Sequence, residues 1–232
     1  MTSSFRKQDM DAEQELGKFI DNNFYRRLES NPGYKSKYKR VVERSVQLDG
    51  VDVIVESPKG KFYIDEKASI YYSNLMIPTF AFEIDSIQEG HDEPVEGWFL
   101  NDELITDYYI LMWPNVKCQE KKIGDKTEFV RVPVREIKSD DFTIIEAMLI
   151  KKQTLREAVE KDGADKVKLK SIAKELRENE KDDIVVLNDN MRVMITRRLA
   201  EKPINLVIRK EYLKKLANAT FLISEDGYGR IQ

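Results

Sequence analysis

Three residues that could do chemistry lie in one stretch of the sequence, GVDVIVESPKGKFYIDEKAS at residues 50–69: Asp52, Asp65 and Lys67. They fall in two short apolar runs, on either side of SPKG, that are typical of β-strands. Acidic residues are depleted in strand interiors, and like charges that face each other across a sheet destabilise it. Such a placement calls for a compensating interaction, and a divalent metal ion would supply one.

The loop SPKG suggests how strands at 51–56 and 61–67 would pair. If the hairpin closes symmetrically around this loop, Asp52 faces Asp65 directly, with Cβ atoms about 4.5–5.5 Å apart. Lys67 projects from the same face as Asp65, because side chains alternate along a strand. A slip of one residue would put the two carboxylates on opposite faces, so the prediction depends on the register.

Two carboxylates at this separation suit Mg²⁺ or Mn²⁺, hard cations that take oxygen ligands and keep several waters. Such an ion makes a bound water more acidic, and its charge neutralises the charge that develops on a phosphodiester. A nearby lysine orients the attacking water or stabilises the pentavalent transition state. The residue types therefore predict metal-assisted phosphodiester hydrolysis, with Asp52 and Asp65 as metal ligands and Lys67 as the assisting cation.

The composition excludes several other kinds of site. A single cysteine, Cys118, cannot form an internal disulfide, and a single histidine, His91, cannot build a histidine-rich zinc site. A metal ion here must therefore be held mainly by oxygen. The sequence contains no P-loop and no G-x-G-x-x-G motif, which argues against nucleotide hydrolysis by those routes. There is no long apolar run, and the polar start MTSSFRKQDMD lacks the apolar segment of a signal peptide, so we expect no membrane span and a cytoplasmic location.

Charge is distributed unevenly along the chain. The net charge of −3 argues against a protein that coats nucleic acid by charge alone. Residues 26–44, RRLESNPGYKSKYKRVVER, are nevertheless rich in Lys and Arg, with Tyr34 and Tyr38 interleaved. This composition suits phosphate contact with some stacking, although an ordinary solvated helix end and loop would look the same.

Hydrophobic periodicity outlines the elements that would position these residues. Residues 10–29 are expected to form a helix, because apolar residues recur at three-to-four spacing until NPG ends the run. Strands are expected at 38–47, 51–56, 61–69, 79–87, 105–113 and 128–137. From residue 140 the pattern becomes helical, through DFTIIEAMLIKK, TLREAVEKDG and VKLKSIAKELRENEKDD. Strands at MRVMITR and INLVIRK, a helix at EYLKKLANA and a strand at TFLIS complete the chain.

This order of elements favours one α/β domain over residues 1–232. We expect a core at 1–139 and an extension of helices and strands at 140–232 that packs on it. The aromatic segment WFLNDELITDYYILMW is expected in the core and on the sheet surface rather than as a base-stacking platform.

The run GVDVIV followed by YIDEK resembles the motif of the PD-(D/E)xK nuclease superfamily, whose members have the restriction-endonuclease-like fold. On this resemblance Asp52 takes the place of the first motif acid, Asp65 that of the second, and Lys67 that of the motif lysine. The match covers about residues 10–70. No proline precedes Asp52, and the helix that usually follows the lysine-bearing strand is not evident in IYYSNLMIPTFAFEIDSI.

The resemblance implies an α/β fold with a mixed central sheet flanked by helices. It also implies a nuclease that hydrolyses phosphodiester bonds of nucleic acid, with DNA as the expected substrate, Mg²⁺ or Mn²⁺ as the cofactor, and a homodimer as in many members. Two other functions stay open: a non-catalytic nucleic-acid or protein interaction module that keeps the fold, and a structural domain of a larger assembly. In the plainest interpretation, Asp65 and Lys67 only form surface ion pairs on a solvent-facing hairpin.

A third acid would complete the site. Superfamily members often carry a glutamate on the first core helix, and AEQELGKFI offers Glu13 and Glu15. Glu13 is preferred because it lies three residues before Leu16 and seven before Ile20, on the stripe expected to face the sheet. Glu83, in FAFEIDSI, is either an additional ligand or a solvent-facing residue on a half-exposed sheet.

Overall fold

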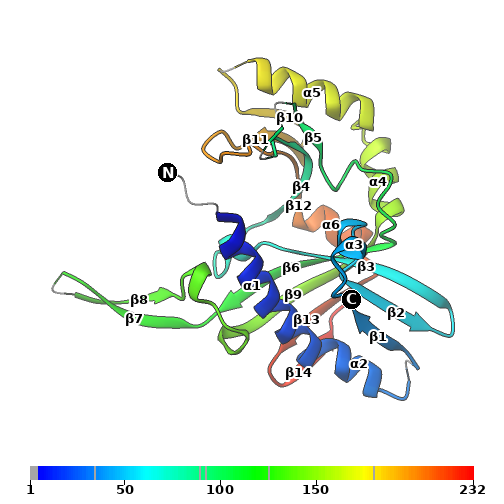
Figure 1. Cartoon of the computed structure of the whole chain (residues 1–232), viewed down its shortest axis with the longest axis vertical. Coiled ribbons are helices and arrows are strands. Elements are labelled where there is room, and N and C mark those ends of the chain that lie inside the picture. The colour runs from blue at the N-terminus through cyan, green and yellow to red at the C-terminus, as the bar shows by residue number, and fades with distance from the viewer. Residues whose placement is uncertain (1–4, 34, 89, 92, 125, 180) are drawn as a thin grey trace.

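The computed structural model describes residues 5–33, 35–88, 90–91, 93–124, 126–179 and 181–232, with side chains for all of these except 5–10, 44 and 123. It shows a mixed α/β structure with two packed sheets, as Figure 1 shows. A large mixed sheet lies in the lower part of that view and a smaller antiparallel sheet in the upper part. The α/β class and a mixed sheet flanked by helices agree with the prediction from the sequence.

The larger sheet contains seven strands in the order β1-β2-β3-β6-β9-β13-β14. They are β1 (Lys37–Arg40), β2 (Val53–Ser57), β3 (Gly60–Ala68), β6 (Tyr108–Val116), β9 (Phe142–Lys151), β13 (Ala219–Ser224) and β14 (Gly227–Arg230). Only β3 and β6 are parallel, and all the other neighbours are antiparallel. Strands from both sides of residue 140 thus share one sheet.

The smaller sheet is antiparallel throughout, in the order β10-β11-β12-β4-β5. Its strands are β10 (Ile184–Asn188), β11 (Met191–Ile195), β12 (Ile204–Arg209), β4 (Thr79–Ser86) and β5 (Val95–Glu96). A separate hairpin of β7 (Cys118–Ile123) and β8 (Lys126–Arg131) projects from the body on the left of Figure 1.

Helices cover the faces of these sheets. The helical elements are α1 (Phe5–Ile20), the π-helical turn η1 (Asp21–Tyr25), α2 (Arg26–Ser30), α3 (Arg44–Leu48), α4 (Lys152–Lys161), α5 (Lys166–Glu178), α6 (Lys210–Leu216) and the 3₁₀ turns η2 (Ile70–Tyr72), η3 (Val134–Glu136) and η4 (Ser139–Asp141). The helix predicted at 10–29 is confirmed as α1, η1 and α2. In the part of the chain that the structure describes, every helix is too short or too polar to cross a membrane.

The larger sheet separates two hydrophobic cores. On one face, α1 buries Leu16, Phe19 and Ile20 against residues such as Ile64 of β3 and Ile110 of β6. The other core lies between the larger sheet, the smaller sheet and helices α4, α5 and α6. Because side chains alternate along β3, its odd-numbered residues point away from α1 and towards this second core.

Strand β9 corrects the helix predicted at DFTIIEAMLIKK. It lies inside the larger sheet between β6 and β13, with Ala147 in the core beside α1 and Met148 and Ile150 in the opposite core. A strand that is buried on both faces has no apolar–polar alternation, so its sequence resembles that of a buried helix.

The structure differs from the predicted elements at three further places. The strand expected at 38–47 ends at Arg40, and residues 44–48 form helix α3. The segment NVKCQEKKIGDK, expected as a turn-rich connection, contains β7, and strand β10 was not predicted. The described side chains of β7 are all exposed, so this strand has no buried face that would mark it. In β10, Val185 and Leu187 pack against the core, but the exposed Ile184 and Val186 are also apolar, so the sequence shows no alternation.

Candidate active site

The hairpin of β2 and β3 has the predicted register. Val53 pairs with Ile64, and Glu56 pairs with Lys61, which is the symmetrical closure around SPKG. On β3, Ile64 belongs to the core beside α1, whereas Asp65 and Lys67 project from the opposite face. The structure therefore brings Asp65 and Lys67 to one face, as the sequence predicts.

Asp65 is buried, with 2% of its surface exposed. Its Oδ1 forms an ion pair with Lys67 Nζ at 2.7 Å, and its Oδ2 has no hydrogen-bond partner among the described residues. Burial raises the pKa of Asp65 to about 7. The Lys67 ammonium opposes this rise, and the charge of the Asp52 carboxylate adds to it.

Asp52 lies directly before β2 and is half-buried. Its backbone N–H donates to the carbonyl of Ile64 at 2.9 Å, and its carbonyl accepts from Val41 at 2.8 Å. Its side-chain Oδ2 accepts a hydrogen bond from the backbone N–H of Glu66 at 2.7 Å. Asp52 is thus fixed between two strands, close enough to Asp65 for its charge to act on the pKa of that group.

Lys67 lies against aromatic side chains on the same face. Its Nζ is 5.1 Å from the ring centroid of Trp98, and Trp98 packs edge-on against Tyr109 at 5.2 Å. Burial by itself would lower the pKa of Lys67, but the carboxylates of Asp65 and Asp52 outweigh it and raise that pKa. Lys67 is therefore a protonated cation at neutral pH.

The structure does not place Glu13 on the buried stripe of α1. Ala12 and Leu16 occupy that stripe, whereas Glu13 is exposed and lines a small surface hollow of about 60 Å³ together with Ala68 and Tyr71. The prediction of a sheet-facing Glu13 is wrong: the buried line of α1 runs through Ala12 and Leu16, and Glu13, about 100° further round the helix from Ala12, lies at its edge. The Glu13 charge still contributes to the raised pKa of Lys67.

The two other candidate glutamates have different surroundings. Glu15 bonds to Lys18 at 2.7 Å and accepts from the backbone N–H of Ser139 at 2.9 Å, so it serves the turn η4. Glu83 of β4 is half-buried and packs against Gly97, where an added Cβ would lie 2.8 Å from Glu83 Cγ. Glu83 thus lies beside the segment that carries Trp98.

The described residues contain no cluster of three or more His, Cys, Asp or Glu side chains arranged to hold a metal ion. A metal site here would therefore rest on the two aspartates, with waters and substrate oxygens as the other ligands. Mg²⁺ is commonly held in this way, by one or two carboxylates plus substrate phosphates.

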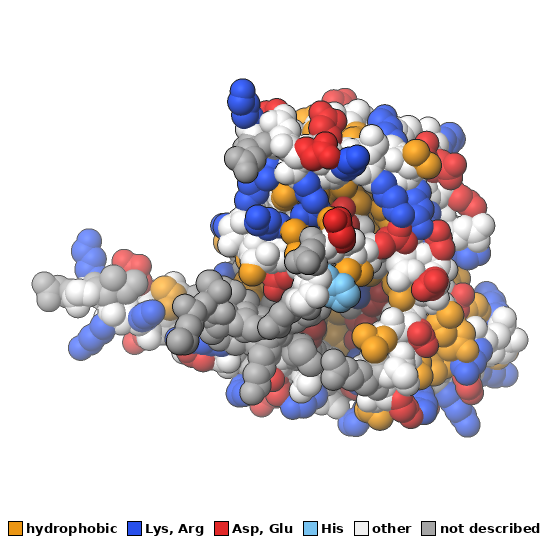
Figure 2. Space-filling view, turned by 45° about the horizontal axis from the view of Figure 1, so that its top comes forward, with side chains coloured by type: hydrophobic (Ala, Val, Ile, Leu, Met, Phe, Trp, Pro, Cys, Tyr) orange, Lys and Arg blue, Asp and Glu red, His pale blue; other side chains and the backbone are white. Residues whose placement is uncertain are grey.

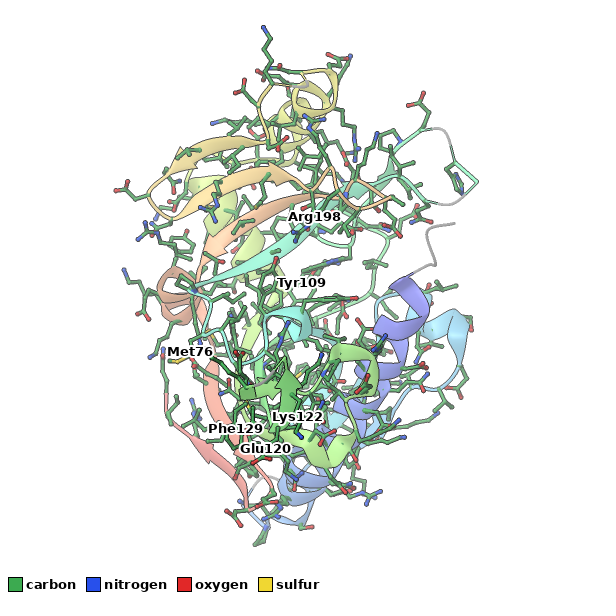
Figure 3. The ribbon with its side chains drawn as sticks, turned by 90° about the vertical axis from the view of Figure 1, so that its left-hand side faces the viewer. Met76, Tyr109, Glu120, Lys122, Phe129 and Arg198 are labelled. Atoms are coloured by element: carbon green, nitrogen blue, oxygen red, sulfur yellow. The ribbon has the colours of Figure 1, made fainter. Side chains whose placement is uncertain are left out.

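Two further residues near the site were not predicted from the sequence as site residues. Tyr109 pairs with Asp65 across the parallel strands β3 and β6, and burial, followed by the Asp65 charge, raises its pKa. Its hydroxyl is buried without a hydrogen-bond partner among the described residues, and Figure 3 shows it between the two sheets. The run DYYILMW on β6 is apolar at every position after Asp107 and is buried on both faces, so it carried no signal for the face on which Tyr109 lies.

Lys152 is the second residue. It is almost fully buried and donates to the carbonyl of Leu104 at 2.7 Å. Burial lowers its pKa to about 8, with the Arg156 charge adding to this effect and nearby carboxylates, including that of Asp65, opposing it. No local pattern marks Lys152, which begins helix α4 directly after the last residue of β9.

Part of the basic segment 26–44 is committed to internal contacts. Arg40 bonds to Asp21 and Glu66 at 2.7 and 2.8 Å, and Tyr38 stacks on Tyr25 with ring centroids 5.2 Å apart. Tyr34 lies outside the described residues. Three exposed lysines remain on this edge of the sheet, at positions 35, 37 and 39.

No family model matches this chain, and the searches of curated proteins and of solved structures gave no significant match.

Proposed function

We propose that the protein is a metal-dependent nuclease that hydrolyses phosphodiester bonds, with DNA as the expected substrate. The observation that carries this proposal is the arrangement of Asp65. Its carboxylate is 2% exposed, has one oxygen on Lys67 at 2.7 Å, and has a second oxygen without a hydrogen-bond partner among the described residues. Asp52, directly before the neighbouring strand β2, is close enough for its charge to act on Asp65.

Stability alone does not account for this arrangement. A buried carboxylate with a raised pKa costs free energy when it ionises, and a buried ion pair is weak evidence for stability. Strongly perturbed acids with a specific charge partner are instead typical of functional sites. The hydrogen bonds of Asp52 and the strand position of Asp65 also hold the two acids on rigid elements, as a catalytic site requires.

The donor set suits Mg²⁺ or Mn²⁺. The two acids offer hard oxygen ligands, and Asp65 Oδ2 is not used by any described residue. Asp52 and Asp65 would hold the ion, which supplies charge neutralisation at the phosphodiester and a more acidic water. The backbone N–H of Glu66 donates a hydrogen bond to Asp52 Oδ2. This bond orients the Asp52 carboxylate and leaves its other oxygen, Oδ1, for a metal ion.

Lys67 would act as a fixed cation. Because neighbouring carboxylates raise its pKa, it stays protonated at neutral pH and cannot serve as a general base. Its three N–H donors would instead contact the scissile phosphate or the attacking water and stabilise negative charge in the transition state. Trp98 beneath the ammonium group limits where Nζ can move. Glu13 would contribute only through the electrostatic field around Lys67.

Cleavage assays test this proposal. Supercoiled plasmid, single-stranded DNA and single-stranded RNA are incubated with the protein in Mg²⁺, Mn²⁺ or EDTA, beside the variants Asp65→Asn and Lys67→Met. We expect metal-dependent cutting that falls by several orders of magnitude in both variants, since the loss affects transition-state stabilisation.

Asp107→Asn is a matched control, because Asp107 Oδ2 also accepts a backbone N–H of β3, from Tyr63 at 2.9 Å, on the side of the strand that faces β6. This variant should cut as well as the wild type. Cutting that persists in Asp65→Asn and Lys67→Met would remove these residues from the mechanism.

A non-catalytic interaction module is the second candidate. The closed ion pair between Asp65 and Lys67, together with the absence of a three-acid cluster among the described residues, favours it. Such a module would bind its partner equally well in Mg²⁺ and in EDTA, and Asp65→Asn would leave that binding unchanged. The same preparations distinguish the two functions.

A further inference from the structure

The hairpin of β7 and β8 is a projecting arm, which we define as residues 117–131. Its two strands pair only with each other, and Figures 1 and 2 show it extending from the body of the protein. An isolated two-stranded hairpin is marginally stable by itself, and it buries little apolar surface. The arm therefore adds little to the hydrophobic core and is available for a contact outside the chain.

One face of the arm exposes a large aromatic side chain beside charged ones. Phe129 is 73% exposed and pairs across the hairpin with Glu120, and Lys122 follows on the same face. Figure 3 shows these three residues together, on the side of the molecule that also carries Met76. Met76 is 86% exposed and has a positive φ of 45°, which is uncommon for a residue other than glycine.

The base of the arm is fastened to the segment that follows the candidate site. Arg131 donates to the carbonyls of Tyr71 and Ser73 at 2.7 and 3.1 Å. Asn74 exchanges two hydrogen bonds with the backbone of Val116, at 2.9 and 2.7 Å. Tyr71 follows Lys67 by four residues, so a short and well-bonded connection links the site to the arm.

The arm has a charge opposite to that of the rest of the chain. It contains five Lys and Arg against three Asp and Glu, a net +2, which leaves −5 for the remaining residues of a chain whose total is −3. Among the described residues, none of its lysines (117, 121, 122 and 126) forms an ion pair. Unpaired lysines that project from an acidic body attract phosphate groups and position them at one place.

We propose that the arm contacts the backbone of the nucleic acid whose phosphodiester the site cleaves. Side chains alternate along β7, so Lys122 contacts a phosphate on the face that carries Phe129, and Lys121 contacts one from the opposite face of the hairpin. Phe129 packs against a sugar or an unstacked base. The identity of the partner, a nucleic acid, rests on the proposed function. That the arm and the site contact the same molecule rests on the short connection between Lys67 and the base of the arm.

A second copy of this chain fits the arm less well. Stable protein interfaces bury about 800 Å² on each partner and contain an apolar centre. On the described part of the arm, Phe129 is the only large hydrophobic side chain that is exposed, and charged residues surround it. Such a surface resembles a polar contact with phosphates more closely than a subunit interface.

Binding in EDTA tests the inference without cleavage. The probes are a fluorescent 30-base-pair DNA duplex, its single strand, and an RNA strand of the same sequence, measured by anisotropy over a range of salt concentrations. The variants are Lys121→Gln/Lys122→Gln and Phe129→Ser. The matched control is Lys161→Gln/Lys174→Gln, which removes the same charge from exposed positions on α4 and α5, away from the arm in Figure 1.

We expect the arm double variant to weaken binding about tenfold and to reduce the slope of log K against log salt concentration by about 2, because two phosphate contacts are lost. Phe129→Ser should weaken binding about tenfold with no change in that slope. The control should leave both quantities as in the wild type, and circular dichroism should show unchanged folding in all variants.

Binding by the arm variants that equals wild type would overturn the inference. So would sedimentation showing that these variants only convert a dimer into a monomer. Cleavage that depends on Asp65 but not on the arm would leave the nuclease proposal standing and remove the arm. Binding that depends on the arm, without cleavage in any metal ion, would support the arm as a nucleic-acid contact and remove the nuclease proposal.

Discussion

The Asp52 carboxylate accepts a hydrogen bond from the backbone N–H of Glu66 at 2.7 Å, so one acid of the candidate site also joins β3 to the segment that begins β2. This bond gives Asp52 a structural role as well as a chemical one. The two roles can be separated, because an amide oxygen can accept the same hydrogen bond but is a poorer ligand for Mg²⁺ than a carboxylate.

Substitutions at Asp52 should therefore separate stability from activity. Asp52→Ala leaves the Glu66 N–H without this acceptor and should lower the free energy of unfolding by about 1–3 kcal/mol. Asp52→Asn should cost less than this, yet abolish cleavage to the same extent. Urea unfolding and plasmid cleavage measure the two effects. Asp52→Asn with near wild-type cleavage would exclude Asp52 as a metal ligand.

Asp65 should make the stability of the metal-free protein depend on pH. Its pKa is raised by burial to about 7, above the value of about 3.9 in an unfolded chain. The folded state therefore binds the proton more tightly, and the stability associated with protonated Asp65 is present below pH 4 and lost as the pH rises to about 7. The free energy of unfolding of wild type, relative to Asp65→Asn, should fall between pH 4 and pH 7. A constant difference over this range would contradict a raised pKa.

Arg40 should stabilise the fold although it lies in the basic segment. Its guanidinium bridges Asp21 and Glu66 at 2.7 and 2.8 Å, and Arg40→Met leaves the Glu66 carboxylate without its partner. We expect a loss of about 3 kcal/mol in the free energy of unfolding, as for other broken buried pairs. Lys37→Met, at an exposed position of the same strand, should change it by less than about 0.5 kcal/mol. Equal effects of the two substitutions in urea unfolding would refute the structural role of Arg40.

Gly97 should tolerate no side chain. A Cβ at this position would lie 2.5 Å from the backbone oxygen of Glu83, so Gly97→Ala must push β4 away from the segment that carries Trp98. We expect a loss of about 1–3 kcal/mol in stability and a lower cleavage rate, because Trp98 supports Lys67. Gly229→Ala is the control, since a Cβ there meets no atom within 4 Å. Thermal unfolding measures the stability of both variants, and cleavage assays measure their activity. Equal behaviour of the two variants would contradict the prediction.

Local patterns were sufficient where one face of an element is buried. The α1 stripe with Leu16, Phe19 and Ile20, and the register of the β2–β3 hairpin, follow from periodicity and from the length of one loop. Local patterns failed where an element is buried on both faces or on neither face. Strand β9 is buried on both faces and resembles a helix, whereas the described side chains of β7 are all exposed and give no signal.

The sequence by itself determined that Asp65 and Lys67 share one face of a strand, because alternation along the backbone is a local property. Only the tertiary structure decided what that face meets. Trp98 is brought beneath Lys67, and Tyr109 is placed beside Asp65, by segments 30 to 45 residues distant in the chain. Burial and charge at these contacts set the pKa values of the site, and both depend on packing between elements that no local pattern encodes.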